Sequence, residues 1–242
     1  MAKFAVLGHK GRMGQALATA IEEAGHELCV GVDIGGDPAP VIGQCEVAVD
    51  FSSPAALKSH LQAAQAANIP ILIGTTGLEA EHFAAIEDAA RHIPVLQTGN
   101  TSLGVTLLAH LVREAAAKLG PDWDIEVLEM HHRMKVDAPS GTAKLLGEAA
   151  ATGRGIELAK NMDSGRHGHT GAREEGAIGF ATLRGGTVAG EHSVILAGSE
   201  ERITLSHVAE NRMIFARGAV RAASWLIGQE AGRYTMGDVL GL

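Results

Sequence analysis

The chain has 242 residues, 46% of them hydrophobic, enough to bury the cores of two unequal domains. A formal net charge of -8, with no long basic run, excludes a non-specific nucleic-acid binder. No apolar stretch is long enough to span a bilayer, and the N-terminus lacks a signal-peptide layout, so we expect a cytoplasmic protein.

The N-terminal part of the chain alternates between short apolar strands and helical patterns. We expect strands at Lys3–Leu7, Glu27–Val32, Val47–Phe51, Pro70–Ile73 and Pro94–Leu96. Helical patterns lie between them, at Gln15–Ala24, after Pro54 and at Glu79–Arg91. This alternation predicts an α/β fold with a Rossmann-type, doubly wound parallel sheet.

The pattern changes after Ser102. Helices are expected at Leu103–Leu119 and Thr142–Ala151, with a strand at Asp124–Met130 between them and a loop rich in Gly, His and charge at 153–176. Three strands then follow without helices, at Ala177–Arg184, His192–Ala197 and Arg202–His207, which favours an open antiparallel or mixed sheet. An amphipathic helix at Phe215–Ile227 could return to the first domain.

These patterns predict two domains. A dinucleotide-binding domain is expected to comprise residues 1–102 and 213–242, and an α+β substrate-binding and oligomerisation domain residues 103–212.

A glycine turn follows the first strand, with the spacing G-x-x-G-x-x-G from Gly8 to Gly14. Glycines at a strand-to-helix turn let the backbone approach a pyrophosphate, and the helix N-terminus supplies N–H donors. The alternative is a tight structural turn, since the usual fingerprint is G-x-G-x-x-G. The candidate cofactor contacts here are Gly8, His9, Lys10, Gly11, Arg12 and Met13.

Asp33 closes the second strand, where an acid can bind the ribose hydroxyls of an adenosine. No arginine follows it to receive a ribose 2′-phosphate, so its charge favours NADH over NADPH. Lys10 or Arg12 could compensate, which keeps NADPH open. Two later loops also follow strands at the ligand-binding edge of the sheet, and add the candidates Gly74, Thr75, Thr76, Thr98, Gly99, Asn100 and Thr101.

The segment from Glu126 to Ala143 is the most informative. A strand runs into a loop carrying His131, His132, Arg133 and Lys135, and a helix then starts at Ser140-Gly141-Thr142. Cationic groups beside free helix N–H donors form an anion site, and histidine can act as a general acid near neutral pH.

Each part of this segment has a simpler alternative, such as a structural histidine, a helix cap or a solvated basic run. A zinc site is disfavoured because adjacent histidines on a strand face opposite ways and no cysteine pair supports one. We therefore expect no metal, and we expect Cys29 and Cys45 to be free thiols.

The same segment closely resembles the signature of the dihydrodipicolinate reductases, E-x-x-E-x-H-H-R-x-K-x-D-x-P-S-G-T-A, which is present in full. The glycine turn, the Gly74 and Asn100 loops, and the runs around Phe180, Gly190 and Arg212 also look like that family. The resemblance covers essentially the whole chain in order. The region around Gly35–Gln44 is shorter than in many members, which bears on adenosine binding and not on the reaction.

The resemblance implies reduction of the cyclic dicarboxylate 4-hydroxytetrahydrodipicolinate with NADH or NADPH, in lysine and diaminopimelate biosynthesis. It implies that His131 and Lys135 are the candidate proton donors. It also implies substrate contacts from His132, Ser140, Gly141, Thr142 and Arg212, and a homotetramer joined through the sheets of the substrate domains. The competing hypotheses are another NAD-dependent amino-acid dehydrogenase and a non-catalytic dinucleotide sensor.

Overall fold

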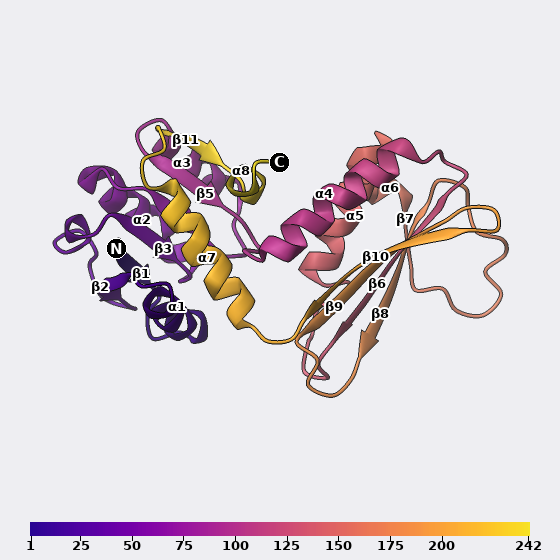
Figure 1. Cartoon of the computed structure of the whole chain (residues 1–242), viewed down its shortest axis with the longest axis horizontal. Helices are drawn as coiled ribbons and strands as arrows, with labels where there is room; N and C mark the ends of the chain where they lie inside the picture. The colour runs from indigo at the N-terminus through magenta and orange to yellow at the C-terminus, as the bar shows by residue number, and fades with distance from the viewer. The chain divides into compact units, whose positions relative to one another are not determined.

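The computed structural model describes every residue from Met1 to Leu242. The chain divides into two compact units, one of residues 1–103 and 213–242 and the other of residues 104–212 (Figure 1). It therefore passes between the units twice. None of the helices combines the length and apolar character that a membrane crossing requires.

The first unit contains the expected parallel sheet, with six strands in place of five. Their order is β11-β5-β4-β3-β1-β2, and their bounds are β1 Lys3–Leu7, β2 Glu27–Val32, β3 Val47–Asp50, β4 Ile71–Ile73, β5 Pro94–Gln97 and β11 Gly232–Tyr234. The helices are α1 Arg12–Glu23, α2 Pro54–Ala67, α3 Ala80–Ala90, α7 Met213–Leu226 and α8 Met236–Leu240, with a 3₁₀ turn, η1, at Ile42–Gln44. The prediction of a doubly wound sheet is confirmed.

Side-chain alternation along the strands divides the interior of this unit into two cores. On β1, Phe4 and Val6 pack with α1, α7 and α8, whereas Ala5 and Leu7 pack with α2 and α3 on the opposite face. Because both faces are covered, the strands are apolar without a polar face.

The parallel register places the ends of the strands together. Leu7 lies beside Val32 on one side and Asp50 on the other, and Asp50 lies beside Ile73. The loops that follow β1, β2, β3 and β4 therefore emerge at one edge of the sheet, where ligands of such folds bind.

The second unit is a mixed five-stranded sheet with helices. Its strand order is β10-β9-β6-β8-β7, and its elements are α4 Leu103–Lys118, β6 Asp124–His131, α5 Gly141–Arg154, α6 Leu158–Asn161, β7 Met162–Ser164, β8 Ile178–Arg184, β9 Gly190–Ala197 and β10 Arg202–Ala209. One face packs on α4 and α5 through residues such as Ile125 and Val127 of β6.

Four short elements were not predicted from the sequence. The expected loop at 153–176 contains α6 and β7, and β11 and α8 follow the last expected helix. They have three to five residues each, too few to establish a period, and β11 reads Gly-Arg-Tyr without an apolar alternation. The consecutive strands β8 and β9 are not neighbours, because β6 lies between them, parallel to β8 and antiparallel to β9.

Candidate active site

The turn between β1 and α1 brings backbone close to backbone. Gly8 has φ of +86°, and a Cβ atom there would overlap with the carbonyl group of Phe51. A Cβ atom on Gly14 would overlap with the carbonyl oxygens of Gly8 and His9. Only glycine fits at these two positions. The close packing of the turn is thus sufficient to explain both glycines, and it is also compatible with a bound ligand.

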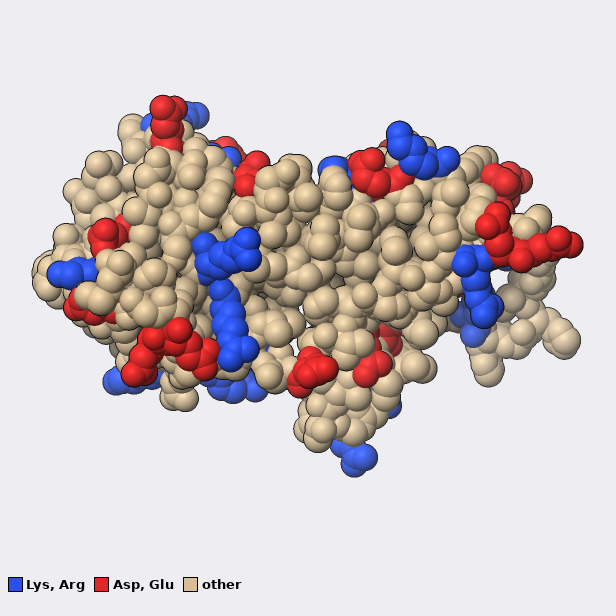
Figure 2. Space-filling model, in the orientation of Figure 1, with Lys and Arg blue, Asp and Glu red and all other residues tan.

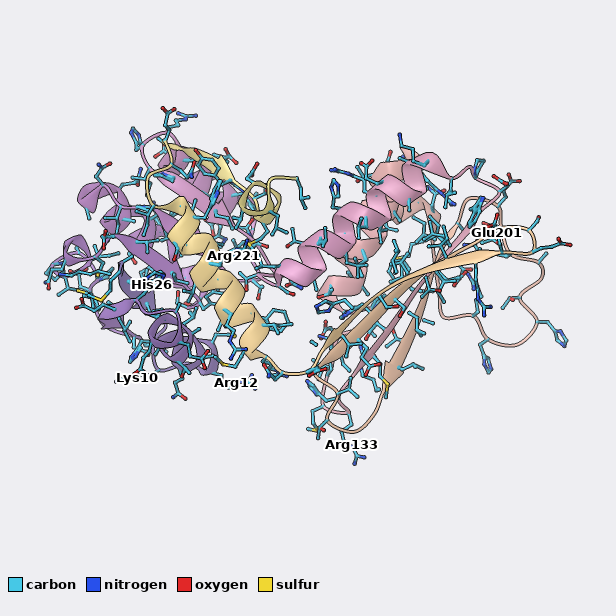
Figure 3. All side chains as sticks on the ribbon, viewed as in Figure 1. Lys10, Arg12, His26, Arg133, Glu201 and Arg221 are labelled. Carbon is cyan, nitrogen blue, oxygen red and sulfur yellow. The ribbon has the colours of Figure 1, made fainter.

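The N-terminus of α1 is suited to an anion. Its N-cap is Gly11, and no side chain caps the first turn, so its N–H groups are left to other acceptors. Arg12 follows immediately, and it is an exposed member of a short basic stripe over α1 and α7 that also includes Arg221 (Figures 2 and 3). The uncapped helix start and the two close glycines fit the pyrophosphate of a dinucleotide.

The side chain of Asp33, which follows β2, is hydrogen-bonded to this turn. Its carboxylate accepts hydrogen bonds from the backbone N–H of Ile34 at 2.8 Å and of Lys10 at 2.5 Å. The hydrogen bond from Ile34, and then that from Lys10, lower the pKa of Asp33 below its usual value. Each oxygen keeps a lone pair for a ribose hydroxyl.

A cavity of about 380 Å³ lies beside the turn. It is lined by Gly8, Gly11, Val32–Gly36, Phe51–Ser53, Ala56, Ser59 and His60. The lining contains no Lys or Arg side chain, and the nearest charge that acts on Asp33 is that of Lys10, outside the lining.

Three threonines of the other predicted cofactor loops form hydrogen bonds within the chain. Thr75 is 4% exposed and donates its hydroxyl to Asp50, and the Thr101 hydroxyl donates to the carbonyl oxygen of Phe215. The Thr98 hydroxyl donates to the carbonyl oxygen of Asn100 and accepts from its N–H. The hydroxyls of Thr75 and Thr101 are thus engaged within the chain, whereas Thr76 is exposed.

In the second unit, strand alternation brings an acid and a histidine together. Residues 125, 127, 129 and 131 of β6 share the buried face, so Glu129 and His131 continue the line of Ile125 and Val127 toward the strand end. The Glu129 carboxylate lies 2.5 Å from Nδ1 of His131 and is 1% exposed. Since a carboxylate only accepts, we assign the proton of this bond to Nδ1.

Arg184 completes the binding of Glu129. Its guanidinium reaches both carboxylate oxygens, at 2.7 and 2.9 Å, from the neighbouring strand β8. The backbone N–H of Ser140 donates to Glu129 as well, at 3.1 Å. Burial would raise the pKa of Glu129, but the bonds from Arg184, His131 and Ser140 together lower it below its ordinary value.

Two further buried residues surround His131. His192 packs edge-on against it with ring centroids 5.0 Å apart, and bonds through Nε2 to the Ser140 hydroxyl at 3.1 Å. Burial lowers the pKa of His192 to about 4, so this ring is neutral at pH 7. The Ser140 hydroxyl also caps α5 by accepting from Ala143 N–H, and the direct substrate contact expected for it stays a prediction.

The remaining predicted substrate residues lie in the same unit. Nε2 of His132 is 3.0 Å from the Arg212 guanidinium, and desolvation, followed by the charge of Arg212, lowers the pKa of His132. The ammonium of Lys135 is 2.7 Å from Asp137, which lowers the pKa of that acid. Gly141 and Thr142 form the first turn of α5. No group of three or more His, Cys, Asp or Glu side chains is arranged to hold a metal.

Three residues of this network were not among the predicted site residues. From the sequence, Glu129 could either orient a histidine or pair across the sheet, because it is two positions before His131 on a strand and must share its face. Arg184 and His192 could not be predicted, because they come from β8 and β9, and only the sheet order shows that both strands flank β6.

The fold and the two sets of residues define a class: a two-domain NAD(P)-dependent oxidoreductase, with a Rossmann-type unit and a buried glutamate–histidine pair in a separate α+β unit. Residues 2–101 match the family described as "Dihydrodipicolinate reductase, N-terminus", and residues 104–240 match "Dihydrodipicolinate reductase, C-terminus". The chain belongs to the dihydrodipicolinate reductase family.

Individual proteins give the same result. The chain is 58% identical to 4-hydroxy-tetrahydrodipicolinate reductase of Methylocella silvestris, over 88% of this chain and 78% of that one. It is 53% identical to 4-hydroxy-tetrahydrodipicolinate reductase 1 of Mesorhizobium japonicum, over 98% and 96%. A solved dipicolinate-bound dihydrodipicolinate reductase from Paenisporosarcina sp. TG-14 shares the fold, with a TM-score of 0.74, 22% identity and 97% of each chain covered.

Proposed function

We propose that this chain reduces 4-hydroxy-tetrahydrodipicolinate to tetrahydrodipicolinate with NAD(P)H, in lysine and diaminopimelate biosynthesis. Family membership supports the reaction, and the single observation that carries it is the Glu129–His131 pair at the end of β6, beside the N-terminus of α5. The reaction consumes one NAD(P)H and one proton and releases water. When bound, the nicotinamide supplies the hydride.

His131 acts in this proposal as the proton donor. With the Nδ1 proton held by Glu129, the ring exchanges its other proton at Nε2, which has no partner in the chain. Gly190 keeps that nitrogen accessible, since a Cβ atom there would lie 3.1 Å from it. The proton quenches the negative charge that hydride addition places on the substrate ring.

Lys135 serves as a substrate-binding group and an alternative donor. Its ammonium is held by Asp137 at 2.7 Å, and the pair must loosen if Lys135 is to reach a substrate. His132 and Arg212, which are bonded to each other, would bind one substrate carboxylate, and the N–H groups of Gly141 and Thr142 the other.

We propose that the dinucleotide binds to the first unit. The N–H groups at Gly11–Met13 would bind the pyrophosphate, Asp33 the ribose, and the backbone of Gly74–Thr76 and Thr98–Thr101 the remainder. We propose a preference for NADH over NADPH, because the Asp33 carboxylate and a cavity without Lys or Arg both disfavour a 2′-phosphate.

Domain roles, assembly and location complete the proposal. Residues 1–102 and 213–242 bind the cofactor, and residues 103–212 bind the substrate and form a homotetramer through their sheets, with hinges near Ser102 and Arg212. Partly exposed apolar side chains on the sheet of the second unit, Leu183, Ile203 and Val208, suit such contacts. Light scattering of the purified protein tests the tetramer. The cytoplasmic location stays a prediction.

The reaction is tested by NADH oxidation with substrate generated in place from pyruvate and aspartate semialdehyde by the preceding synthase. Oxidation that depends on the synthase is the expected result, and parallel NADPH assays measure the preference. Protein that binds NADH but oxidises it under none of these conditions contradicts the reductase proposal and favours a dinucleotide sensor.

A further inference from the structure

Asp50 is a buried acid that the proposed reaction does not use. It ends β3, and its side chain is 0% exposed. Burying a carboxylate is unfavourable unless its oxygens are fully hydrogen-bonded, and neither Lys nor Arg is among the partners of Asp50. Asp50 therefore depends on a complete set of hydrogen bonds, and it lies at the ligand-binding edge of the sheet.

The Asp50 carboxylate joins three separate segments. Oδ1 accepts from the backbone N–H of Ser52 at 2.9 Å, from its hydroxyl at 2.6 Å, and from the hydroxyl of Thr75 at 3.0 Å. Oδ2 lies 2.8 Å from Nδ1 of His60, in the middle of α2. The loop after β3, the loop after β4 and the helix α2 are therefore tied to one group.

All three segments belong to the dinucleotide-binding edge. Phe51–Ser53 and His60 line the cavity beside the glycine turn, and Thr75 is in the predicted cofactor loop. The carbonyl oxygen of Phe51, one residue after Asp50, lies 2.5 Å from the position that a Cβ atom of Gly8 would take. A shift of the Asp50 backbone would therefore move Phe51, the next residue, which packs against the glycine turn.

The negative charge of Asp50 works against a bound pyrophosphate, so electrostatic attraction cannot be its contribution. Its contribution is geometric: a carboxylate can accept four hydrogen bonds at once, and an amide or hydroxyl side chain in its place has fewer acceptor sites. Such a network fixes a loop before the ligand arrives and lowers the entropy lost on binding.

We propose that Asp50 is a positioning residue for NAD(P)H: with His60, Ser52 and Thr75 it holds the two loops at the dinucleotide cavity in the binding geometry. This inference rests on the proposed function only for the identity of the ligand. It requires no substrate and no turnover.

The test is the dissociation constant of NADH for the purified full chain, measured by nicotinamide fluorescence without substrate. Asp50→Asn keeps the shape but turns one acceptor into a donor, and we expect NADH binding to weaken about tenfold or more. In assays with substrate, KM for NADH should rise while kcat at saturating NADH changes less than about threefold.

His26→Asn is the matched control. His26 also joins separate elements of the first unit, through Ala2 N–H at 3.2 Å and the Ser224 hydroxyl at 3.2 Å, but it does not line the cavity. Its loss should lower the melting temperature and leave NADH affinity unchanged. Equal NADH affinity in Asp50→Asn and the wild type would overturn the inference and reduce Asp50 to a stabilising residue.

His60 gives a second route if Asp50→Asn fails to fold. His60→Leu removes the donor to Asp50, whereas His60→Asn supplies an amide donor in its place. Weaker NADH binding in His60→Leu, partly restored in His60→Asn, supports the inference; equal affinities in both variants and the wild type contradict it. A wild-type chain that binds neither NADH nor NADPH refutes the proposed function itself, which is a different result.

Discussion

Two regions of the molecule bury the same pair of groups, an acid that ends or nearly ends a strand and a histidine bonded to it through Nδ1. In the second unit Glu129 lies 2.5 Å from His131, and in the first unit Asp50 lies 2.8 Å from His60. Both acids are almost completely buried. By residue type alone, either pair could be the catalytic one.

The partners of the acids separate the two roles. Glu129 is bound by the guanidinium of Arg184, and in our proposal this positive charge holds the carboxylate in place beside His131 while the ring exchanges a proton. Besides His60, Asp50 is bound by two hydroxyls and a backbone N–H, with no Lys or Arg, an arrangement that fixes loops. An acid–histidine pair is therefore assigned to chemistry or to positioning by what surrounds the acid.

The largest effect is expected from His131→Gln. It removes the group that exchanges the proton, and kcat should fall about a thousandfold, within the range for loss of a general acid. NADH affinity should be unchanged, because His131 belongs to the other unit. Stopped-flow turnover and NADH titration measure the two effects. His167→Gln, in an exposed loop of the same unit, is the control, and a kcat for His131→Gln close to this control would remove His131 from the mechanism.

Glu129→Gln should have the next largest effect on kcat, and it tests the difference between the two acid–histidine pairs directly. The amide keeps an acceptor for His131 or Arg184 but loses the charge that stabilises the protonated ring, and kcat should fall about a hundredfold with unchanged NADH affinity. Asp50→Asn should show the opposite pattern, with weaker NADH binding and nearly normal kcat. If both variants change the same constant, the distinction between the two pairs is wrong.

A smaller effect, about tenfold, is expected at Asp33. Its lowered pKa keeps it ionised at neutral pH, and Asp33→Ser removes the repulsion of a 2′-phosphate while keeping a hydrogen-bonding side chain. The ratio of kcat/KM for NADPH to that for NADH should rise, as measured in parallel steady-state assays. Glu27→Ser, at the other end of β2, is a control that should leave the ratio unchanged, and an unchanged ratio in Asp33→Ser would assign cofactor choice to other residues.

Strand alternation and glycine spacing were enough to predict the parallel sheet, the glycine turn and the segment around His131. Periodicity is a local property, and these elements are long enough to show it. The Asp50 network was not predicted, because its members at 50, 52, 60 and 75 are joined only by the packing of β3, α2 and the loop after β4. Arg184, which binds Glu129, and His192, which packs on His131, were not predicted for the same reason: they are brought together by a strand order in which β6 separates β8 from β9.

The smallest effect is on the pH dependence of the free energy of unfolding. It comes from His192 and is absent at pH 7. Burial lowers the pKa of His192 to about 4, below the value near 6.5 of an unfolded chain. Between these two values the unfolded chain binds a proton that the folded chain does not, so stability falls as the pH is lowered through this window, by at most about 1.4 kcal/mol per pH unit. The lowered pKa of Glu129 adds a loss of the same sign below about pH 4.5, where the unfolded carboxyl is protonated first.

His192→Gln keeps a hydrogen-bonding group for Ser140 and does not titrate. Denaturant unfolding at pH 7, 6 and 5 should therefore give a shallower pH slope in this variant than in the wild type, and equal slopes would show that the neutral ring beside His131 is not what makes this unit sensitive to mild acid.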